Sequence, residues 1–392
     1  MFRLMKPAVV CVGDAGINGL ATVRSLGRRG VPVHVVALKT SAQIASASRY
    51  CRSFTPAKDL GSLHDTLRGL EPGAVLYVDN DPMLKALAPH AAALARRFAL
   101  VEEIADAARL TDKAWQLRVA RQAGIPVPHS WFPRSWDDLA SLRTPKRLIA
   151  KPLSGRADFK ALIAASGADL AAALRGQVAS PEEVVVQEFV EGDDAQIYVA
   201  LCYRARSSSR CFVLSARKLR QTQPGAGVMA VGQALDAPQV REMTRRLAKA
   251  ADVRGAFCTE FKLDARDGRY YFIEWNPRPA YFQSIGWQAG FDLAWLAYCD
   301  HADPGALAAM NSSYSGEHYW INLQGDLRHL AKAPELVLEP ATWRPYVRRK
   351  EWAVFALDDL APWRRSLRQL AAWIFTRTPF GRASGRLAAR RA

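Results

Sequence analysis

The sequence has few of the features that define several common classes of protein. Its six cysteines show no CxxC spacing, which argues against a zinc site or a disulfide framework and indicates reduced thiols in a cytoplasmic protein. Its seven histidines form no HExxH or HxxxH pair, which disfavours a zinc hydrolase, and no GxSxG elbow is present. No run approaches the roughly 20 apolar residues of a membrane span, and the first residues lack the apolar stretch and cleavage site of a secretory signal.

What the sequence has in excess is positive charge. Its 392 residues, 49 % apolar and 23 % charged, are typical of a globular protein of two or three domains. Lysine and arginine number 54 against 37 aspartates and glutamates, which gives a net charge of +17. Residues 340–392 carry twelve basic and three acidic side chains, a net charge of +9. The basicity is therefore largely a property of the C-terminal stretch.

The N-terminal region predicts a parallel sheet. An apolar run over 8–16, a helical pattern and a second apolar run over 31–38 give a strand–helix–strand order with a right-handed crossover. The glycines have the spacing GxxGxxG, not the GxGxxG of a dinucleotide fingerprint, and no acidic residue ends the second strand. A turn that needs small residues, a small-ligand site and an NAD site all stay open. We expect a Rossmann-like domain over residues 1–107.

A second region mixes strands and helices. Residues 111–128 predict a helix that Thr111 or Asp112 caps and Gly124 ends. Several apolar runs, a further helix and a hairpin follow, a succession typical of an α+β domain. We expect this domain over residues 108–300, followed by a family-specific helical extension that ends at residue 392.

The hairpin over 259–276 carries the most informative residues. Glu274 and Asn276 are two residues apart on one strand and so share a face. A turn centred on Asp267 places Glu260 opposite Glu274, and two carboxylates with an amide oxygen are ligands that Mg²⁺ accepts. A strict two-residue turn would put the glutamates on opposite faces, so the metal interpretation requires an odd loop or a bulge. A solvated polar face is the alternative interpretation.

The chain resembles the ATP-grasp enzymes over most of residues 8–300. DGRYYFIEWNPRP resembles their terminal metal-binding motif, and TDKAWQLRVARQAGIPVP, LIAKPLSG and VVVQEFVEGDDAQ resemble their nucleotide-binding segments, in the family's order. The resemblance implies an ATP-grasp fold with ATP and Mg²⁺ as cofactors, or Mn²⁺ in place of Mg²⁺. It implies that the metal ligands are Glu260, Glu274 and Asn276, and that Lys113 and Lys151 contact the phosphates. It places Gln187, Glu188 and Val190 at adenine. Asp194, in preference to Asp193, would bind the ribose hydroxyls.

The resemblance also implies the reaction. Transfer of the γ-phosphoryl group to a carboxylate gives an acyl phosphate, which an amine attacks, and catalysis is mainly positioning and charge neutralisation. Arg278 would grip the acceptor carboxylate or the acyl phosphate bidentately. Lys218 or Arg220 would approach the γ-phosphate, with a solvent-exposed cationic strand as the alternative. The acids and amide at 79–81, at a strand end, are candidates to face the nucleophile.

The loop over 154–163 departs from the family pattern. The family's phosphate-covering loop is rich in glycine, whereas Gly155 is the single glycine here. Fewer glycines leave fewer backbone amides free to close over a triphosphate. Arg156 or Lys160 would supply charge instead.

GLATVRSLGRRGVPVHVVA and NPRPAYFQSIGWQAGFDLAWLAY resemble a bacterial subgroup of carboxylate–amine ligases that is also similar to D-aspartate ligase. The implied function is an ATP- and Mg²⁺-dependent ligase that joins a small-molecule carboxylate to an amine and releases ADP and phosphate. Two alternatives stay open. One is an NAD(P)-dependent oxidoreductase, which rests on the first strand–helix–strand unit. The other is a nucleotide-binding protein without turnover, which the glycine-poor loop favours.

The basic C-terminal stretch predicts an amphipathic helix. Trp363, Leu367, Leu370 and Ile374 recur at helical spacing with arginines beside them. The helix either packs on the enzyme or makes a membrane-surface contact through 363–376, peripheral to the inner face of the membrane. A nucleic-acid partner is disfavoured because the stretch lacks a recognised module.

Overall fold

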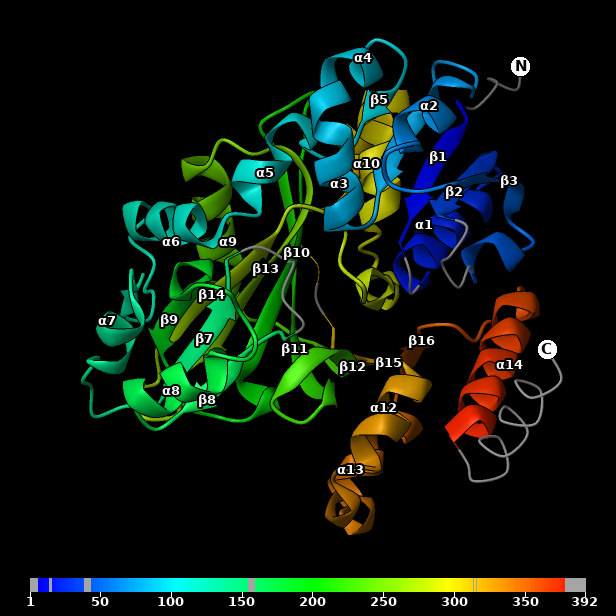
Figure 1. Cartoon of the computed structure of the whole chain (residues 1–392). Helices are drawn as coiled ribbons and strands as arrows, with labels where there is room; N and C mark the ends of the chain where they lie inside the picture. Colours follow the sequence, from blue (N-terminus) through cyan, green and yellow to red (C-terminus); the bar gives the residue numbers. More distant parts are fainter. Residues whose placement is uncertain are drawn as a thin grey trace, which may run out of the picture.

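The computed structural model describes residues 6–13, 16–38, 44–153, 159–312, 314 and 316–377. Within these ranges the strands form three sheets with helices packed around them (Figure 1). The strands are β1 (Ala8–Val12), β2 (Val33–Leu38), β3 (Cys51–Ala57), β4 (Val75–Val78), β5 (Ala99–Leu100), β6 (Ser130–Trp131), β7 (Leu148–Pro152), β8 (Leu162–Ala164), β9 (Val184–Glu188), β10 (Ile197–Arg204), β11 (Cys211–Gln223), β12 (Ala226–Ala234), β13 (Gly255–Leu263), β14 (Tyr270–Asn276), β15 (His318–Ile321) and β16 (Lys350–Trp352).

The α-helices are α1 (Ile17–Gly27), α2 (Leu63–Arg68), α3 (Asp81–Leu87), α4 (Ala91–Ala95), α5 (Ala107–Leu110), α6 (Lys113–Gln122), α7 (Trp136–Ala140), α8 (Gly167–Leu174), α9 (Pro238–Ala250), α10 (Leu293–Ala302), α11 (Pro304–Ala309), α12 (Leu323–Leu330), α13 (Pro340–Val347) and α14 (Leu360–Arg377). Within the described ranges, no helix has both the length and the apolar character needed to cross a membrane.

The first sheet is parallel, as the sequence predicts, with the order β3-β2-β1-β4-β5. β1 is a continuous apolar run buried along its whole length, as expected of a parallel strand covered on both faces. Gly16, just before α1, has the left-handed φ of 67° that favours glycine. A Cβ on Gly19 would lie 2.5 Å from the Cγ2 atom of Val12. Both glycines fit a tight turn that needs small residues.

The central region folds into two further sheets, in agreement with the predicted α+β pattern. One is antiparallel with the order β6-β9-β7-β8, and the other has the order β14-β13-β10-β11-β12-β15-β16. Asp112 caps α6 by accepting a hydrogen bond from the Trp115 amide at 3.0 Å. β15 and β16, which the sequence did not predict, extend the second sheet beyond β12. The domain boundaries at 107 and 300 stay predictions.

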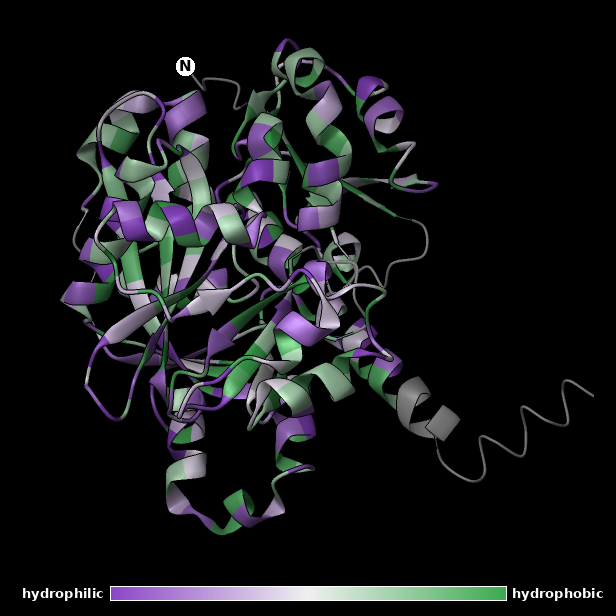
Figure 2. Ribbon diagram, turned by 60° about the vertical axis from the view of Figure 1, so that its left-hand side comes forward, coloured by the Kyte–Doolittle hydropathy of each residue, from purple (hydrophilic) through white to green (hydrophobic). Residues whose placement is uncertain are grey.

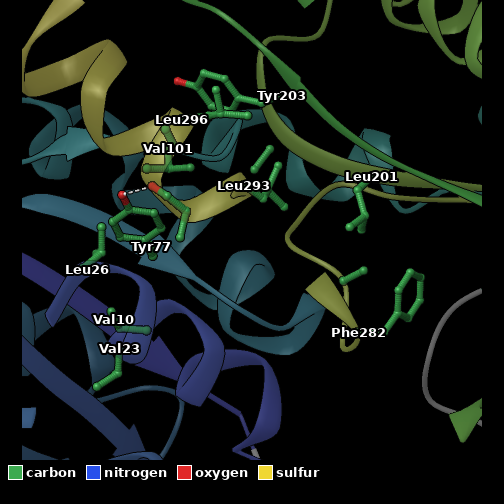
Figure 3. Packing of buried hydrophobic residues seen from close by; sticks show 14 of the residues in the cluster. Val10, Val23, Leu26, Tyr77, Val101, Leu201, Tyr203, Phe282, Leu293 and Leu296 are labelled. Carbon is green, nitrogen blue, oxygen red and sulfur yellow. Dashed lines mark hydrogen bonds between the residues drawn. The ribbon is translucent and has the colours of Figure 1, made fainter. Parts of the chain in front are cut away.

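One hydrophobic core joins the parallel sheet to the seven-stranded sheet. Val10 and Tyr77 from the first sheet belong to the same buried cluster as Leu201 of β10 and Leu296 of α10 (Figure 3). The Tyr77 hydroxyl donates a hydrogen bond to the carbonyl of Ala294 in α10 at 2.9 Å. Helix α10 thus packs against both sheets, and their positions relative to each other are fixed by apolar packing.

A buried ion pair ties the segment before α14 to α1. The Arg24 Nε atom lies 3.0 Å from Asp359 Oδ2, and the two side chains are 2 % and 1 % exposed. Asp359 also accepts hydrogen bonds from Ser48 Oγ and the Arg49 amide. Every oxygen of this carboxylate therefore has a partner, which a buried charge requires.

Asp359→Asn is expected to lower the free energy of unfolding by about 3–5 kcal/mol, because it leaves the Arg24 guanidinium buried without a counter-charge. Urea unfolding followed by circular dichroism measures the loss. The matched control is Asp106→Asn, in the exposed pair with Arg109, which is expected to cost less than about 1 kcal/mol. Equal effects of the two exchanges would contradict this role of the buried pair.

Candidate active site

A cavity of about 530 Å³ opens between strands of the four-stranded and seven-stranded sheets. Among the residues that line it are ten that the resemblance assigns to the site: Lys113, Lys151, Gln187, Glu188, Val190, Lys218, Glu260, Glu274, Asn276 and Arg278. They come from α6, β7, β9 and its C-terminal end, β11, β13, β14 and the segment after β14. The fold thus brings to one place side chains that lie up to 165 residues apart in the chain.

The two glutamates of the hairpin lie opposite each other because β14 contains a bulge. Glu260 pairs with Glu274, but the next residue, Phe261, pairs with Phe272. Ile273 is therefore the extra residue on β14, and it reverses the alternation of side chains beyond it. The bulge that the metal interpretation requires is present. Without it, period-two alternation would turn Glu274 away from Glu260.

Lysines from both sheets line the cavity together with the carboxylates. Lys218 Nζ lies 2.8 Å from Glu260 Oε2, in a pair whose side chains are largely buried. Burial lowers the pKa of Lys151 to about 8; the charge of Glu274 counteracts this shift, and that of Lys113 adds to it. A half-buried site that holds both signs of charge can bind a polyanion together with a cation.

Arg278 is held by a residue from the parallel sheet's side of the cavity. Its Nε and Nη2 atoms lie 2.9 and 3.1 Å from the two carboxylate oxygens of Asp81, the first residue of α3. Burial works to lower the pKa of Arg278, but the carboxylates of Asp81, Asp79 and Glu274 together raise it. Lys85, one turn further along α3, also lines the cavity. The sequence marked Asp81 as a candidate to face the nucleophile, but the pairing with Arg278 was missed.

Several predicted residues, among them Arg220 and Asp194, do not line the cavity. Arg220 is buried and forms a two-point ion pair with Asp326, at 2.6 and 2.8 Å. The physical reason is a bulge in β11: Lys218 pairs with Gly232, but Arg220 pairs with Val231. The side chain of Arg220 therefore leaves the face that Lys218 occupies. We assign Arg220 no part in the site.

Asp194 is the second predicted residue that is engaged elsewhere. Its carboxylate accepts hydrogen bonds from the Gln221 amide and side chain and from the Gly225 amide, at 2.8–3.1 Å. It thereby fixes the turn between β11 and β12. Asp193 caps the short 3₁₀ helix η5 (Asp194–Gln196) through the Ala195 amide.

Residues 154–158 of the glycine-poor loop, half of its length, lie outside the described residues. The predictions for Gly155 and Arg156 lie there. Lys160, at the described end of the loop, lines the cavity. At the predicted adenine end, Gln187 Nε2 donates to Ser130 Oγ at 3.0 Å, and Glu188 pairs with Lys146 at 2.7 Å.

No protein-family model and no curated protein matches the sequence. Solved structures do resemble the fold. N5-carboxyaminoimidazole synthetase from Staphylococcus aureus, complexed with ADP, has a TM-score of 0.63 at 16 % identity, over 86 % of this chain and 88 % of that one. Biotin carboxylase from Campylobacter jejuni has a TM-score of 0.61 at 14 % identity, over 81 % and 75 %. L-amino acid ligase from Bacillus licheniformis has a TM-score of 0.57 at 17 % identity, over 76 % and 74 %. The chain therefore has the ATP-grasp fold.

The amine of Lys151 is expected to titrate near pH 8, well below an ordinary lysine, because burial disfavours its charged form. Its modification by acetic anhydride, followed by peptide mass spectrometry, should therefore rise through pH 8. Glu274→Gln removes a charge that favours the ammonium, so the midpoint should fall further. The control Glu191→Gln should leave it unchanged, since Glu191 pairs with Arg147. A midpoint near 10.5 in the unmodified chain would contradict the assignment.

Proposed function

We propose that the protein is an ATP- and Mg²⁺-dependent ligase that joins a carboxylate to an amine through an acyl phosphate. The observation that carries the proposal is the pairing of Glu260 with Glu274 in the cavity of an ATP-grasp fold, with Asn276 on the same strand and lysines on the facing strands. Two of the similar structures support it: one is an L-amino acid ligase and another is a synthetase complexed with ADP.

The donor set fits Mg²⁺. In the described ranges no three acidic, histidine or cysteine side chains form a metal cluster. Mg²⁺ needs only one or two carboxylates, because waters and substrate phosphates complete its shell. Glu260, Glu274 and Asn276 would hold the ion, which neutralises charge between the β- and γ-phosphates when bound. Since Lys218 already occupies one oxygen of Glu260, the lysine and the ion would share this carboxylate.

The lysines are placed to neutralise a triphosphate. Lys113 and Lys151 line the same cavity as the two glutamates. Burial lowers the pKa of Lys151 to about 8. An anionic phosphate beside it would favour the ammonium form, so binding above that pH would add a proton to the Lys151 amine. Residues 187–190, at the end of β9, would contact adenine.

Arg278 would bind the acceptor carboxylate. Its guanidinium carries more donors than Asp81 uses, and a planar guanidinium matches a carboxylate or an acyl phosphate. Asp81 orients the guanidinium and keeps it charged, so it is a positioning residue. Transfer of the γ-phosphoryl group to the acceptor oxygen activates the acyl carbon. The amine then forms the new C–N bond there, and phosphate leaves.

The reaction is tested by screening pairs of carboxylic acids and amines for ADP release with Mg²⁺-ATP. A pair that gives ADP only when acid, amine and metal are all present supports the proposal. ATP turnover that no acid stimulates, over a broad set that includes amino acids, would contradict it.

Glu274→Gln keeps the side chain's shape and removes a ligand charge. It should lower ADP release by about a hundredfold or more, because several kcal/mol of charge stabilisation at the phosphates is lost. Glu242→Gln, on the exposed face of α9, is the matched control and should retain the full rate. Normal turnover by the Glu274 variant would contradict the metal assignment.

A further inference from the structure

A helical projection, residues 323–347, extends from the seven-stranded sheet (Figures 1 and 2). It consists of α12, the 3₁₀ helix η7 (Pro334–Leu338) and α13. It leaves the sheet after β15 and returns to β16, which pairs with β15. None of the residues that line the cavity belongs to it. The projection is therefore an appendage with no place in the proposed reaction.

The projection exposes large apolar side chains to water. Eight of the eleven exposed large hydrophobic residues in the described part of the chain lie between 327 and 367. Leu338 of η7 is 87 % exposed and Val347 of α13 is 78 % exposed. The exposed apolar residues of the projection are Leu327, Val337, Leu338, Trp343 and Val347. Figure 2 shows apolar residues near its end. Five large apolar side chains exposed within 21 residues of the chain, from 327 to 347, make this segment the candidate for an interaction surface.

The charges around these side chains are mainly positive. The exposed basic residues on the projection and directly after it are Arg328, Lys332, Arg344, Arg348 and Arg349. The exposed acids on it are Glu335 and Glu339. The third acid, Asp326, is fully buried and bound to Arg220. Its negative charge therefore faces inward, while the arginines beside it face solvent.

We propose that the projection docks on a lipid bilayer with anionic headgroups. Aliphatic side chains flanked by lysine and arginine suit the boundary between headgroups and acyl chains, where the apolar groups insert and the cations meet the phosphates. A second copy of the chain would bring one basic surface against another. A nucleic acid would leave the exposed leucine and valines without partners.

This surface differs from the membrane contact predicted at 363–376. In α14, Trp363 packs against the main hydrophobic core, and Ser366 accepts a hydrogen bond from Gln324 at 2.6 Å. The start of that apolar stripe is thus covered by the protein. Leu367 is exposed, and α14 as a membrane helix stays a prediction.

The test is co-sedimentation of the full chain with phosphatidylcholine vesicles, with and without phosphatidylglycerol. The protein should sediment with the anionic vesicles at low salt and leave them at about 0.5 M NaCl, where charges are screened within a few ångströms. It should not sediment with pure phosphatidylcholine, and duplex DNA should not displace it from the anionic vesicles. Absence of binding to anionic vesicles overturns the proposal.

A pair of matched leucines separates the projection from the basic C-terminal stretch. Leu338→Asp should lower vesicle binding about tenfold or more, because an apolar group leaves the bilayer and a negative charge enters. Leu357→Asp adds the same charge at a leucine that is 83 % exposed outside the projection, and should retain binding. Equal binding by both variants assigns the contact to another segment and overturns the proposal. Loss of a dimer by Leu338→Asp would also overturn it, in favour of a second copy.

Discussion

One extra residue in β14 is the constraint on which the candidate site depends. Because Ile273 forms a bulge, Glu274 and Asn276 share their face with Glu260 instead of pointing to the other side of the sheet. A second bulge, in β11, keeps Lys218 on the cavity face and turns Arg220 into an ion pair with Asp326. The two irregularities separate charges that serve the cavity from charges that hold the seven-stranded sheet to its C-terminal helices.

The cavity is organised around charge pairs that a ligand can share. Lys218 pairs with Glu260, and Arg278 pairs with Asp81. The two pairs limit the cost of keeping these four charges half-buried, because each of the four side chains has a partner of opposite charge. A nucleotide polyphosphate with its metal ion would bring the same two signs of charge. The site can therefore be assembled before a ligand binds. The low pKa of Lys151 is a consequence of its burial in this site.

Sequence patterns predict what is local. The parallel first sheet, a helix cap at Thr111 or Asp112 and the need for an odd loop or a bulge between Glu260 and Glu274 all follow from patterns within about thirty residues. The pairings of Arg278 with Asp81 and of Arg24 with Asp359 were missed, because they join residues 197 and 335 positions apart. β15 and β16 were missed because strands of four and three residues are too short to show an alternation. Arg220 was misplaced because a bulge inverts the simple rule that alternate residues share a face.

The most direct measurement of the central claim is thermal unfolding with Mg²⁺-ATP, with ATP and EDTA, and with NAD(P). A ligand at about one hundred times its Kd adds about 2.7 kcal/mol to the stability of the state that binds it, which is a shift of a few degrees. The account predicts stabilisation by Mg²⁺-ATP that EDTA abolishes. No shift with Mg²⁺-ATP but a shift with NAD(P) would contradict it, and would move the site to the glycine turn before α1.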